Sequence, residues 1–146
     1  MNERLVVSES ELARQRDFAA RVRALPERPR SFHVVTMGCQ MNERDSETLA
    51  GMLVEMGLRP ERVRERADLI LYNTCCVREN AENRALGNVI WLKELKKERP
   101  ELLICVGGCM AQEEGMAERM KSMYPFIDLV FGTHNMHRLP EYLCRV

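Results

Sequence analysis

The sequence predicts an α/β fold in which a mostly parallel sheet of about four to five strands lies between two layers of helices. Short runs rich in β-branched and aromatic residues alternate with longer segments of helical periodicity. Such alternation produces βαβ units, whose strands run parallel. The length of 146 residues suits one domain, since about 150 residues per domain is usual. We therefore expect a three-layer, Rossmann-like or flavodoxin-like domain with an N-terminal helical extension.

The helical extension is expected to cover residues 1–30, and the α/β domain residues 31–146. Ser8 and Glu11 have the spacing of a capping box, which predicts that a helix begins there. Prolines after residue 25 predict its end. The apolar residues at roughly helical spacing, which we expect to pack inward, are Leu12, Phe18, Val22 and Leu25.

Within the domain, strands and helices follow each other in order. The expected strands are Phe32 to Met37, Leu69 to Thr74, Leu102 to Val106 and Leu129 to Phe131, with another short one after Gly57. The expected helices run from Asn42, as a capping residue, to Met56, from Glu79 to Arg99, from Met110 to Met123 and from Met136 to Cys144. The ligand crevice of such folds lies beyond the carboxyl ends of the strands, so the residues that follow each strand are the candidates for function.

Composition and charge exclude several classes of protein. Lys and Arg number 22 and Asp and Glu number 22, so this is not a strongly basic nucleic-acid module. No apolar run reaches the ~18 residues that a membrane-spanning helix needs. The polar, acidic start of the chain lacks the pattern of a secretory signal, so we expect a cytoplasmic protein whose thiols stay reduced. The six cysteines then need an explanation other than disulfides.

Three of these cysteines stand at three consecutive expected junctions between a strand and the helix that follows it. They are Cys39 in Met37-Gly38-Cys39, Cys75 in Asn73-Thr74-Cys75, and Cys109 in Gly107-Gly108-Cys109. There are 35 residues between the first and second and 33 between the second and third, about one βα unit each. If the strands are neighbours, the three thiols converge at one edge of the sheet.

The chemistry of this position favours thiolates. A helix N-terminus lowers the pKa of a nearby thiol and stabilises the thiolate, the form that binds metal. Gly38 before Cys39, and Gly107 and Gly108 before Cys109, allow a bulky group to approach the backbone closely. Three thiolates suit either a zinc ion that lacks a fourth ligand or an iron–sulfur cluster with one open iron. A cysteine at a strand end is also commonly a small buried residue, so a module without metal stays an alternative.

The other three cysteines are interpreted as structural. Cys76 lies next to Cys75 where a helix is expected to begin, Cys105 lies inside an apolar strand, and Cys144 lies near the end of the chain. The common nucleotide-phosphate, zinc-protease and serine-hydrolase motifs do not occur in the sequence.

At these residues the sequence resembles the N-terminal domain of the radical-SAM methylthiotransferases. The resemblance covers about Phe32 to Leu143. Its motifs are Met37-Gly38-Cys39-Gln40-Met41-Asn42, Asn73-Thr74-Cys75-Cys76-Val77-Arg78-Glu79-Asn80-Ala81, Gly107-Gly108-Cys109-Met110-Ala111-Gln112, Phe131-Gly132-Thr133-His134-Asn135 and His137-Arg138-Leu139-Pro140. The run Gly-Cys-Gln-Met-Asn is most similar to the branch that modifies N6-isopentenyladenosine in tRNA.

The resemblance implies that Cys39, Cys75 and Cys109 hold an auxiliary [4Fe–4S] cluster whose open iron carries the sulfur of the methylthio group. The adjacent residues that would orient the sulfur or donate hydrogen bonds to the cluster are Gln40, Asn42, Asn73 and Arg78. The family usually has a small residue where Cys76 stands, so either neighbouring thiol is a candidate ligand. None of these residues is expected to act as a nucleophile.

The resemblance also implies what this chain lacks. The family's second [4Fe–4S] cluster, which acts with S-adenosylmethionine, uses a C-x₃-C-x₂-C motif in a following barrel domain, and that motif is absent here, as is the C-terminal RNA-binding domain. We therefore expect the isolated chain to be inactive and to meet tRNA only in the intact enzyme. The alternatives are a sister enzyme that modifies a ribosomal protein or threonylcarbamoyladenosine, a zinc domain, and a non-catalytic α/β module with structural cysteines.

Overall fold

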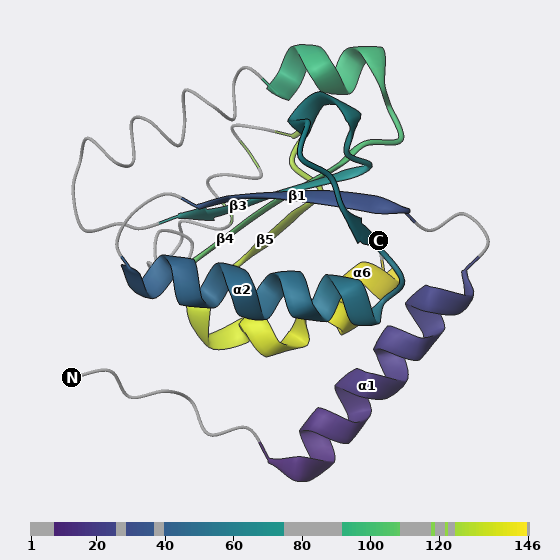
Figure 1. Cartoon of the computed structure of the whole chain (residues 1–146), viewed down its shortest axis with the longest axis vertical. Helices are drawn as coiled ribbons and strands as arrows, with labels where there is room; N and C mark the ends of the chain where they lie inside the picture. The colour runs from purple at the N-terminus through teal and green to yellow at the C-terminus, as the bar shows by residue number, and fades with distance from the viewer. Residues whose placement is uncertain are drawn as a thin grey trace.

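The computed structural model describes residues 8–25, 29–36, 40–74, 92–108, 118, 122 and 125–145. Its centre is a five-stranded sheet in which all described pairs are parallel and the strand order is β2-β1-β3-β4-β5 (Figure 1). The strands are β1 (Ser31–Thr36), β2 (Arg59–Pro60), β3 (Leu69–Thr74), β4 (Leu103–Gly108) and β5 (Leu129–Phe131). The predicted α/β class, the parallel sheet and the short strand after Gly57 are confirmed.

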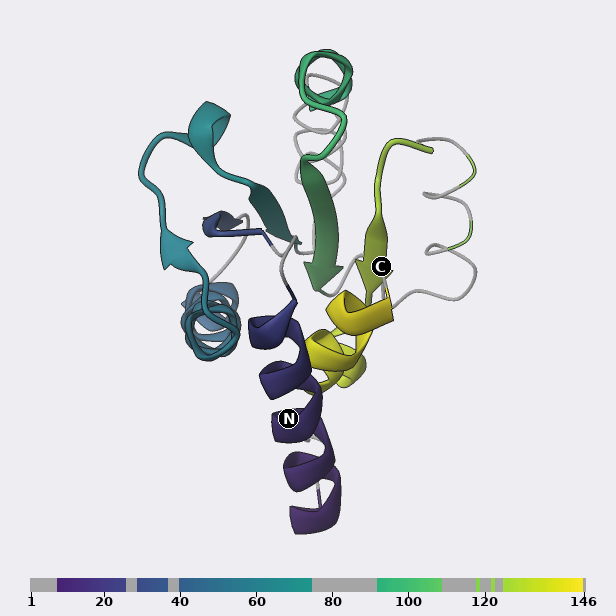
Figure 2. The same ribbon diagram turned by 90° about the vertical axis from the view of Figure 1, so that its right-hand side faces the viewer.

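Helices lie on both faces of this sheet (Figures 1 and 2). One face carries α1 (Glu9–Ala24), α2 (Gln40–Glu55) and α6 (Leu139–Arg145), and the other carries the helical residues 92–98. Two short 3₁₀ helices, η1 (Arg64–Arg66) and η2 (Thr133–Arg138), precede β3 and α6. The order of the strands reverses direction between β1 and β3, which is the place where ligands bind in doubly wound folds.

Both faces of the sheet are buried, as expected for a parallel sheet covered on two sides. In β3, Leu69 and Leu71 pack against α1, α2 and α6, whereas Ile70 and Tyr72 pack with Leu92 on the other side. This alternation follows from the two-residue period of a strand. The periodicity therefore produces two separate hydrophobic cores, one on each face of the central strands.

Helix α1 begins as predicted but buries a different face. The Ser8 hydroxyl accepts a hydrogen bond from the Glu11 backbone N–H at 3.2 Å, which caps the helix. Of the four residues expected to pack inward, Val22 is buried, whereas Leu12 and Leu25 are 42% and 40% exposed. Phe18 lies between the guanidinium groups of Arg14 and Arg21, 5.2 and 5.3 Å from its ring centre. The buried residues of α1 are Gln15, Ala19 and Val22.

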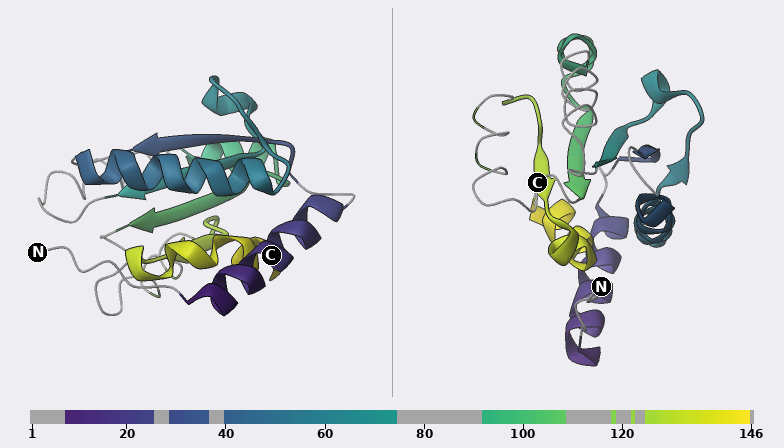
Figure 3. Two further views of the ribbon diagram at one scale, coloured as in Figure 1. Left: turned by 60° about the horizontal axis from the view of Figure 1, so that its bottom comes forward. Right: turned by 90° about the vertical axis from the view of Figure 1, so that its left-hand side faces the viewer.

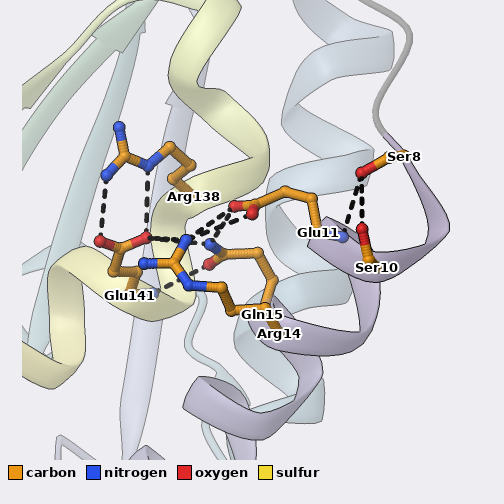
Figure 4. Close-up of polar contacts among 7 residues, drawn as sticks. All are labelled: Ser8, Ser10, Glu11, Arg14, Gln15, Arg138 and Glu141. Carbon is orange, nitrogen blue, oxygen red and sulfur yellow. Dashed lines mark hydrogen bonds and ion pairs between the residues drawn. The ribbon is translucent and has the colours of Figure 1, made fainter.

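Helices α1 and α6 lie side by side (Figure 3), and a polar contact between them explains this change of face (Figure 4). The Glu141 carboxylate on α6 is fully buried and accepts hydrogen bonds from Gln15 Nε2 at 3.0 Å and from Arg138 Nη2 at 3.0 Å. Arg14 adds an ion pair to it at 3.2 Å. A buried carboxylate needs such partners, because its desolvation otherwise costs several kcal/mol. Helix α1 therefore turns its polar Gln15 inward to satisfy Glu141.

Helix α2 begins earlier than predicted and is terminated by a glycine just beyond its last residue, Glu55. It starts at Gln40, so Asn42 lies within the first turn rather than at the predicted capping position. At the other end, Gly57 has a φ of 93°, a left-handed conformation that costs glycine little. The N–H of Leu58 reaches back to the carbonyl of Leu53 at 3.1 Å, as in a Schellman motif.

Other boundaries differ by small amounts. Strand β4 continues to Gly108, beyond the predicted end at Val106, because its last residues pair with the end of β3. The predicted last helix is divided into η2 and α6, and Pro140 lies in the first turn of α6, where a missing N–H is tolerated. Residues 79–91 of the second predicted helix, and all but residues 118 and 122 of the third, lie outside the described residues. In the described part of the chain, no helix has the length and apolar character to cross a membrane.

Candidate functional site at the carboxyl edge of the sheet

The strands that lead to the three predicted cysteine ligands lie side by side. Strand β3 is at the centre and pairs with β1 on one side and β4 on the other. Their last residues are Thr36, Thr74 and Gly108, and the sequence continues from these to Cys39, Cys75 and Cys109. The condition for convergence, that the three strands are neighbours, is therefore met. The three cysteines themselves, together with Cys76 and Arg78, lie outside the described residues.

One row of residues crosses the sheet just before this edge. Thr36 pairs with Asn73, Asn73 with Gly107, and Gly107 with Phe131. Partners in a parallel register point to the same face, which here is the face covered by α2. Thr36 is three residues before Cys39 in the sequence. Asn73 is two residues before Cys75, and Gly107 is two residues before Cys109. This row is therefore the part of the described structure that supports the candidate site, and we call it the edge row (Thr36, Asn73, Gly107 and Phe131).

Two members of the edge row share a partner on α2. Ser46 Oγ lies 2.6 Å from Thr36 Oγ1 and accepts a hydrogen bond from Asn73 Nδ2 at 3.0 Å. Asn73 is 1% exposed and Ser46 is 8% exposed, so their hydrogen bond is buried, whereas Thr36 lies at the exposed end of β1. Buried hydrogen bonds of this kind fix the positions of the groups that make them. Ser46 thus joins the ends of β1 and β3 to the helix that follows β1.

The other two members of the edge row are in close contact. A Cβ atom built on Gly107 would lie 2.5 Å from Cζ of Phe131, so only glycine fits beneath this ring. We expected Gly107 to leave room for a bound group, and the structure assigns this space to Phe131. The Phe131 side chain on β5 is thus the reason that position 107 requires a glycine. The sequence around Gly107 does not reveal this contact.

The donor set fits an iron–sulfur cluster in its chemistry. Cysteine sulfur is the usual ligand of such clusters, and three strands that end side by side lead to three cysteines. Within the described residues, no three His, Cys, Asp or Glu side chains are grouped so as to hold a metal ion elsewhere. Zinc shares the preference for thiolate and stays an alternative occupant.

The described cysteines have the structural role that was predicted for Cys105. Its side chain is fully buried in β4 and packs in the core on the α2 face. Burial raises the pKa of the Cys105 thiol well above its ordinary value, and the nearby Asp128 carboxylate raises it further. Cys105 is therefore held as a thiol, the form that does not bind metal. Cys144 is half-buried and packs against the same core.

Of the four residues expected beside the cluster, the structure describes the side chain of one. Asn73 lies in the edge row, two residues before Cys75. Gln40 is the first residue of α2 and Asn42 lies in its first turn. A role of Ser46 and Thr36 at the site was not predicted. The usable signal was a serine one helical turn after Asn42, on a helix that directly follows a strand.

Known proteins resemble this chain over the same region. Residues 31–132 match the family described as Uncharacterized protein family UPF0004. A Clostridium perfringens protein named tRNA-2-methylthio-N(6)-dimethylallyladenosine synthase is 53% identical over 115 residues, which cover 79% of this chain and 26% of that protein. Proteins of the same name from Clostridium tetani and Clostridium botulinum are each 54% identical over 115 residues and are covered to 25% and 26%.

The matched region contains the whole sheet and all three cysteine positions, whereas α1 and α6 lie outside the residues matched by the family model. The chain spans about a quarter of the length of the relatives that it matches. The resemblance to the N-terminal domain of methylthiotransferases is thereby confirmed. With the family model matching well over half of its residues, this chain belongs to the UPF0004 family, the N-terminal domain of the methylthiotransferases.

Proposed function

We propose that this chain is the sulfur-donor domain of a tRNA methylthiotransferase that adds a methylthio group to C2 of N6-isopentenyladenosine. The observation that carries the proposal is the parallel pairing of β1, β3 and β4, whose ends lead to Cys39, Cys75 and Cys109. The names of the relatives support this choice of substrate. We place the reaction in the cytoplasm, because tRNA is modified there.

The three cysteines would hold an auxiliary [4Fe–4S] cluster, with Cys76 as an alternative to Cys75. When bound, this cluster supplies the sulfur atom of the methylthio group. The chain's own contribution is to hold three thiolates at one edge and leave one iron open. Gln40, Asn42, Asn73 and Arg78 are proposed as neighbours that orient the sulfur or hydrogen-bond the cluster. The second cluster and S-adenosylmethionine belong to the remainder of the intact enzyme, so this chain alone is proposed to be inactive.

The first experiment tests the ligand set. The chain is reconstituted anaerobically with iron and sulfide, and both are counted per chain for the wild type and for separate Cys39→Ala, Cys75→Ala, Cys76→Ala and Cys109→Ala variants. We expect the cluster to be lost in the variants of Cys39, Cys75 and Cys109 and kept in that of Cys76. Cys144→Ala is the matched control, because this thiol lies in the described core.

Other results would decide between the alternatives. Loss of the cluster in Cys76→Ala but not in Cys75→Ala would move the ligand by one residue. Binding of zinc in place of iron and sulfide would identify a zinc domain. A folded chain that binds neither, or that binds iron regardless of these cysteines, would contradict the proposal.

The substrate is tested with the intact enzyme. It is incubated with S-adenosylmethionine, a reductant and either tRNA that carries isopentenyladenosine, tRNA that carries threonylcarbamoyladenosine, or ribosomal protein. We expect the methylthio group, detected by mass spectrometry of nucleosides digested from the tRNA and of peptides digested from the protein, only on isopentenyladenosine. Modification of either of the other substrates instead would assign the chain to a sister branch.

A further inference from the structure

The hydrogen-bonded group of Ser46, Thr36 and Asn73 lies between the elements that lead into and out of the segment containing Cys39. Thr36 is the last residue of β1, and Ser46 lies on α2, which begins at Gln40. The segment between β1 and α2 contains Cys39. The 2.6 Å contact between Ser46 Oγ and Thr36 Oγ1 therefore joins the two elements that flank this cysteine.

The same serine also contacts the strand that leads to the next cysteine. Its Oγ accepts a hydrogen bond from Asn73 Nδ2 at 3.0 Å, and Asn73 is two residues before Cys75. Thr36 and Asn73 are register partners on adjacent strands, so the serine spans the junction at which the strand order reverses. Through these two contacts, the Ser46 side chain joins α2 to both of these strand ends.

We infer that Ser46 is a positioning residue of the metal site: its hydroxyl holds the ends of β1 and β3 against α2, and these two strands lead to Cys39 and Cys75. This inference rests on the proposed function. An iron–sulfur cluster held by three cysteines has one protein ligand fewer than the usual four. A shift in the positions of two of these three ligands should therefore weaken its binding strongly. Loss of a hydrogen bond made directly to a metal ligand typically lowers metal affinity about 10–100-fold. Ser46 contacts residues two or three positions before the proposed ligands, so its effect should fall at the lower end of that range.

The alternative is that the serine only stabilises the fold. A buried hydroxyl between a helix and two strands contributes to stability wherever it lies, so a change in thermal stability does not separate the two roles. The properties of the bound iron–sulfur cluster do separate the structural role from the positioning role. A merely structural serine leaves the electron paramagnetic resonance spectrum and the reduction potential of a bound cluster unchanged once the chain is folded.

The test uses the 146-residue chain reconstituted anaerobically with iron and sulfide. Ser46→Ala removes both contacts, Thr36→Val removes one hydroxyl while keeping the side-chain shape, and Thr36→Ser restores that hydroxyl. Thr48→Val is the matched control, because the Thr48 hydroxyl donates to the carbonyl of Arg44 within α2 and faces solvent. Each variant is examined for the rate of iron loss to a chelator, the spectrum of the reduced cluster and its reduction potential.

We expect Ser46→Ala to lose iron about tenfold faster than the wild type, at the lower end of the range for supporting residues, and to show a changed spectrum and potential. Thr36→Val should change in the same direction by a smaller factor, and Thr36→Ser and Thr48→Val should behave as the wild type. Where Ser46→Ala does not fold, Thr36→Val decides the question, since Thr36 is exposed at the strand end and tolerates the change.

Two results would overturn the inference, and they differ. Wild-type iron loss, spectrum and potential in a folded Ser46→Ala or Thr36→Val chain would reject the positioning role and leave the proposed function intact. A wild-type chain that takes up no iron and sulfide would reject the proposed function and this inference with it.

Discussion

Gln15 on α1 and Glu141 on α6 exchange two hydrogen bonds across the junction between the ends of the chain. Gln15 Nε2 donates to Glu141 Oε1 at 3.0 Å, and the Glu141 backbone N–H donates to Gln15 Oε1 at 3.2 Å (Figure 4). The two residues are 126 positions apart in the sequence. Because both are buried, this pair fixes the helical extension on the domain, and it leads to two predictions.

Gln15→Ala should destabilise the chain by about 1–3 kcal/mol, because it removes a donor and an acceptor from a buried contact. The measurement is the free energy of unfolding in urea, followed by circular dichroism. Arg16→Ala, at the exposed neighbouring position, is the control and should change stability by no more than about 0.5 kcal/mol. An equal effect of the two substitutions would mean that the extension does not depend on this contact.

The stability of the chain should fall in acid through Glu141. Hydrogen bonds from Arg138, followed by that from Gln15 and the charge of Arg14, lower the pKa of this carboxyl from an ordinary value of 4.5 to about 2, although burial opposes the shift. The carboxylate therefore stabilises the folded state fully above pH 4.5, and this contribution is lost as the pH falls toward 2.

Thermal unfolding of the wild type and of Glu141→Gln between about pH 7 and pH 2 measures this contribution. The glutamine does not titrate, so the difference in melting temperature between the two chains should be constant near neutrality and shrink in acid. A difference that stays constant across the whole acid range would exclude Glu141 as the source.

Gly107→Ala should destabilise the chain by about 1–3 kcal/mol, because the added methyl group meets the Phe131 ring and the core must shift. Gly51→Ala is the matched control. Gly51 lies within α2, and a methyl group added there would have nothing within 4 Å, so the change should stabilise the helix by about 0.5–1 kcal/mol. In a Phe131→Leu background, the cost of Gly107→Ala should decrease, and both effects are measured by urea unfolding.

Cys105→Ala should leave the uptake of iron unchanged while lowering stability by about 1 kcal/mol, since it removes a buried sulfur from the core and no ligand. Iron and sulfide counts after reconstitution and urea unfolding measure the two effects. A loss of iron from this variant would contradict the structural role of Cys105.

The sequence allowed the strands to be placed to within two residues, because their hydrophobic runs are bounded by glycine and polar residues. Near-equal spacing placed the three cysteines after strands, on the condition that these strands are neighbours, and the pairing of β1, β3 and β4 meets that condition. The buried face of α1 was predicted only in part, with Val22 buried but Leu12 and Leu25 exposed, because apolar periodicity assumes an apolar partner. Here the partner includes the Glu141 carboxylate, and a contact between positions 15 and 141 leaves no local signal.

The same limit applies to the candidate site. Asn73 was singled out because it is close to a cysteine in sequence, whereas Ser46 is linked to the site only through the packing of α2 on β1 and β3. Gly107 was interpreted as space for a ligand, because the ring that fills this space comes from β5. Residues that support a site from another element become visible only when the register of the sheet is known.

The edge of the sheet at β2 limits how this protein can associate with others. The N–H groups of Arg59 and Glu61 donate to the carbonyls of Arg30 and Phe32. The backbone nitrogen and carbonyl of the residue between them therefore point away from β1, toward the free edge of the sheet. That residue is Pro60, which has no N–H to offer to an incoming strand. A row of unpaired backbone donors is what allows sheets of separate molecules to join and aggregate. The proline removes a donor from this exposed edge, so at β2 the sheet is protected from growing by addition of another chain.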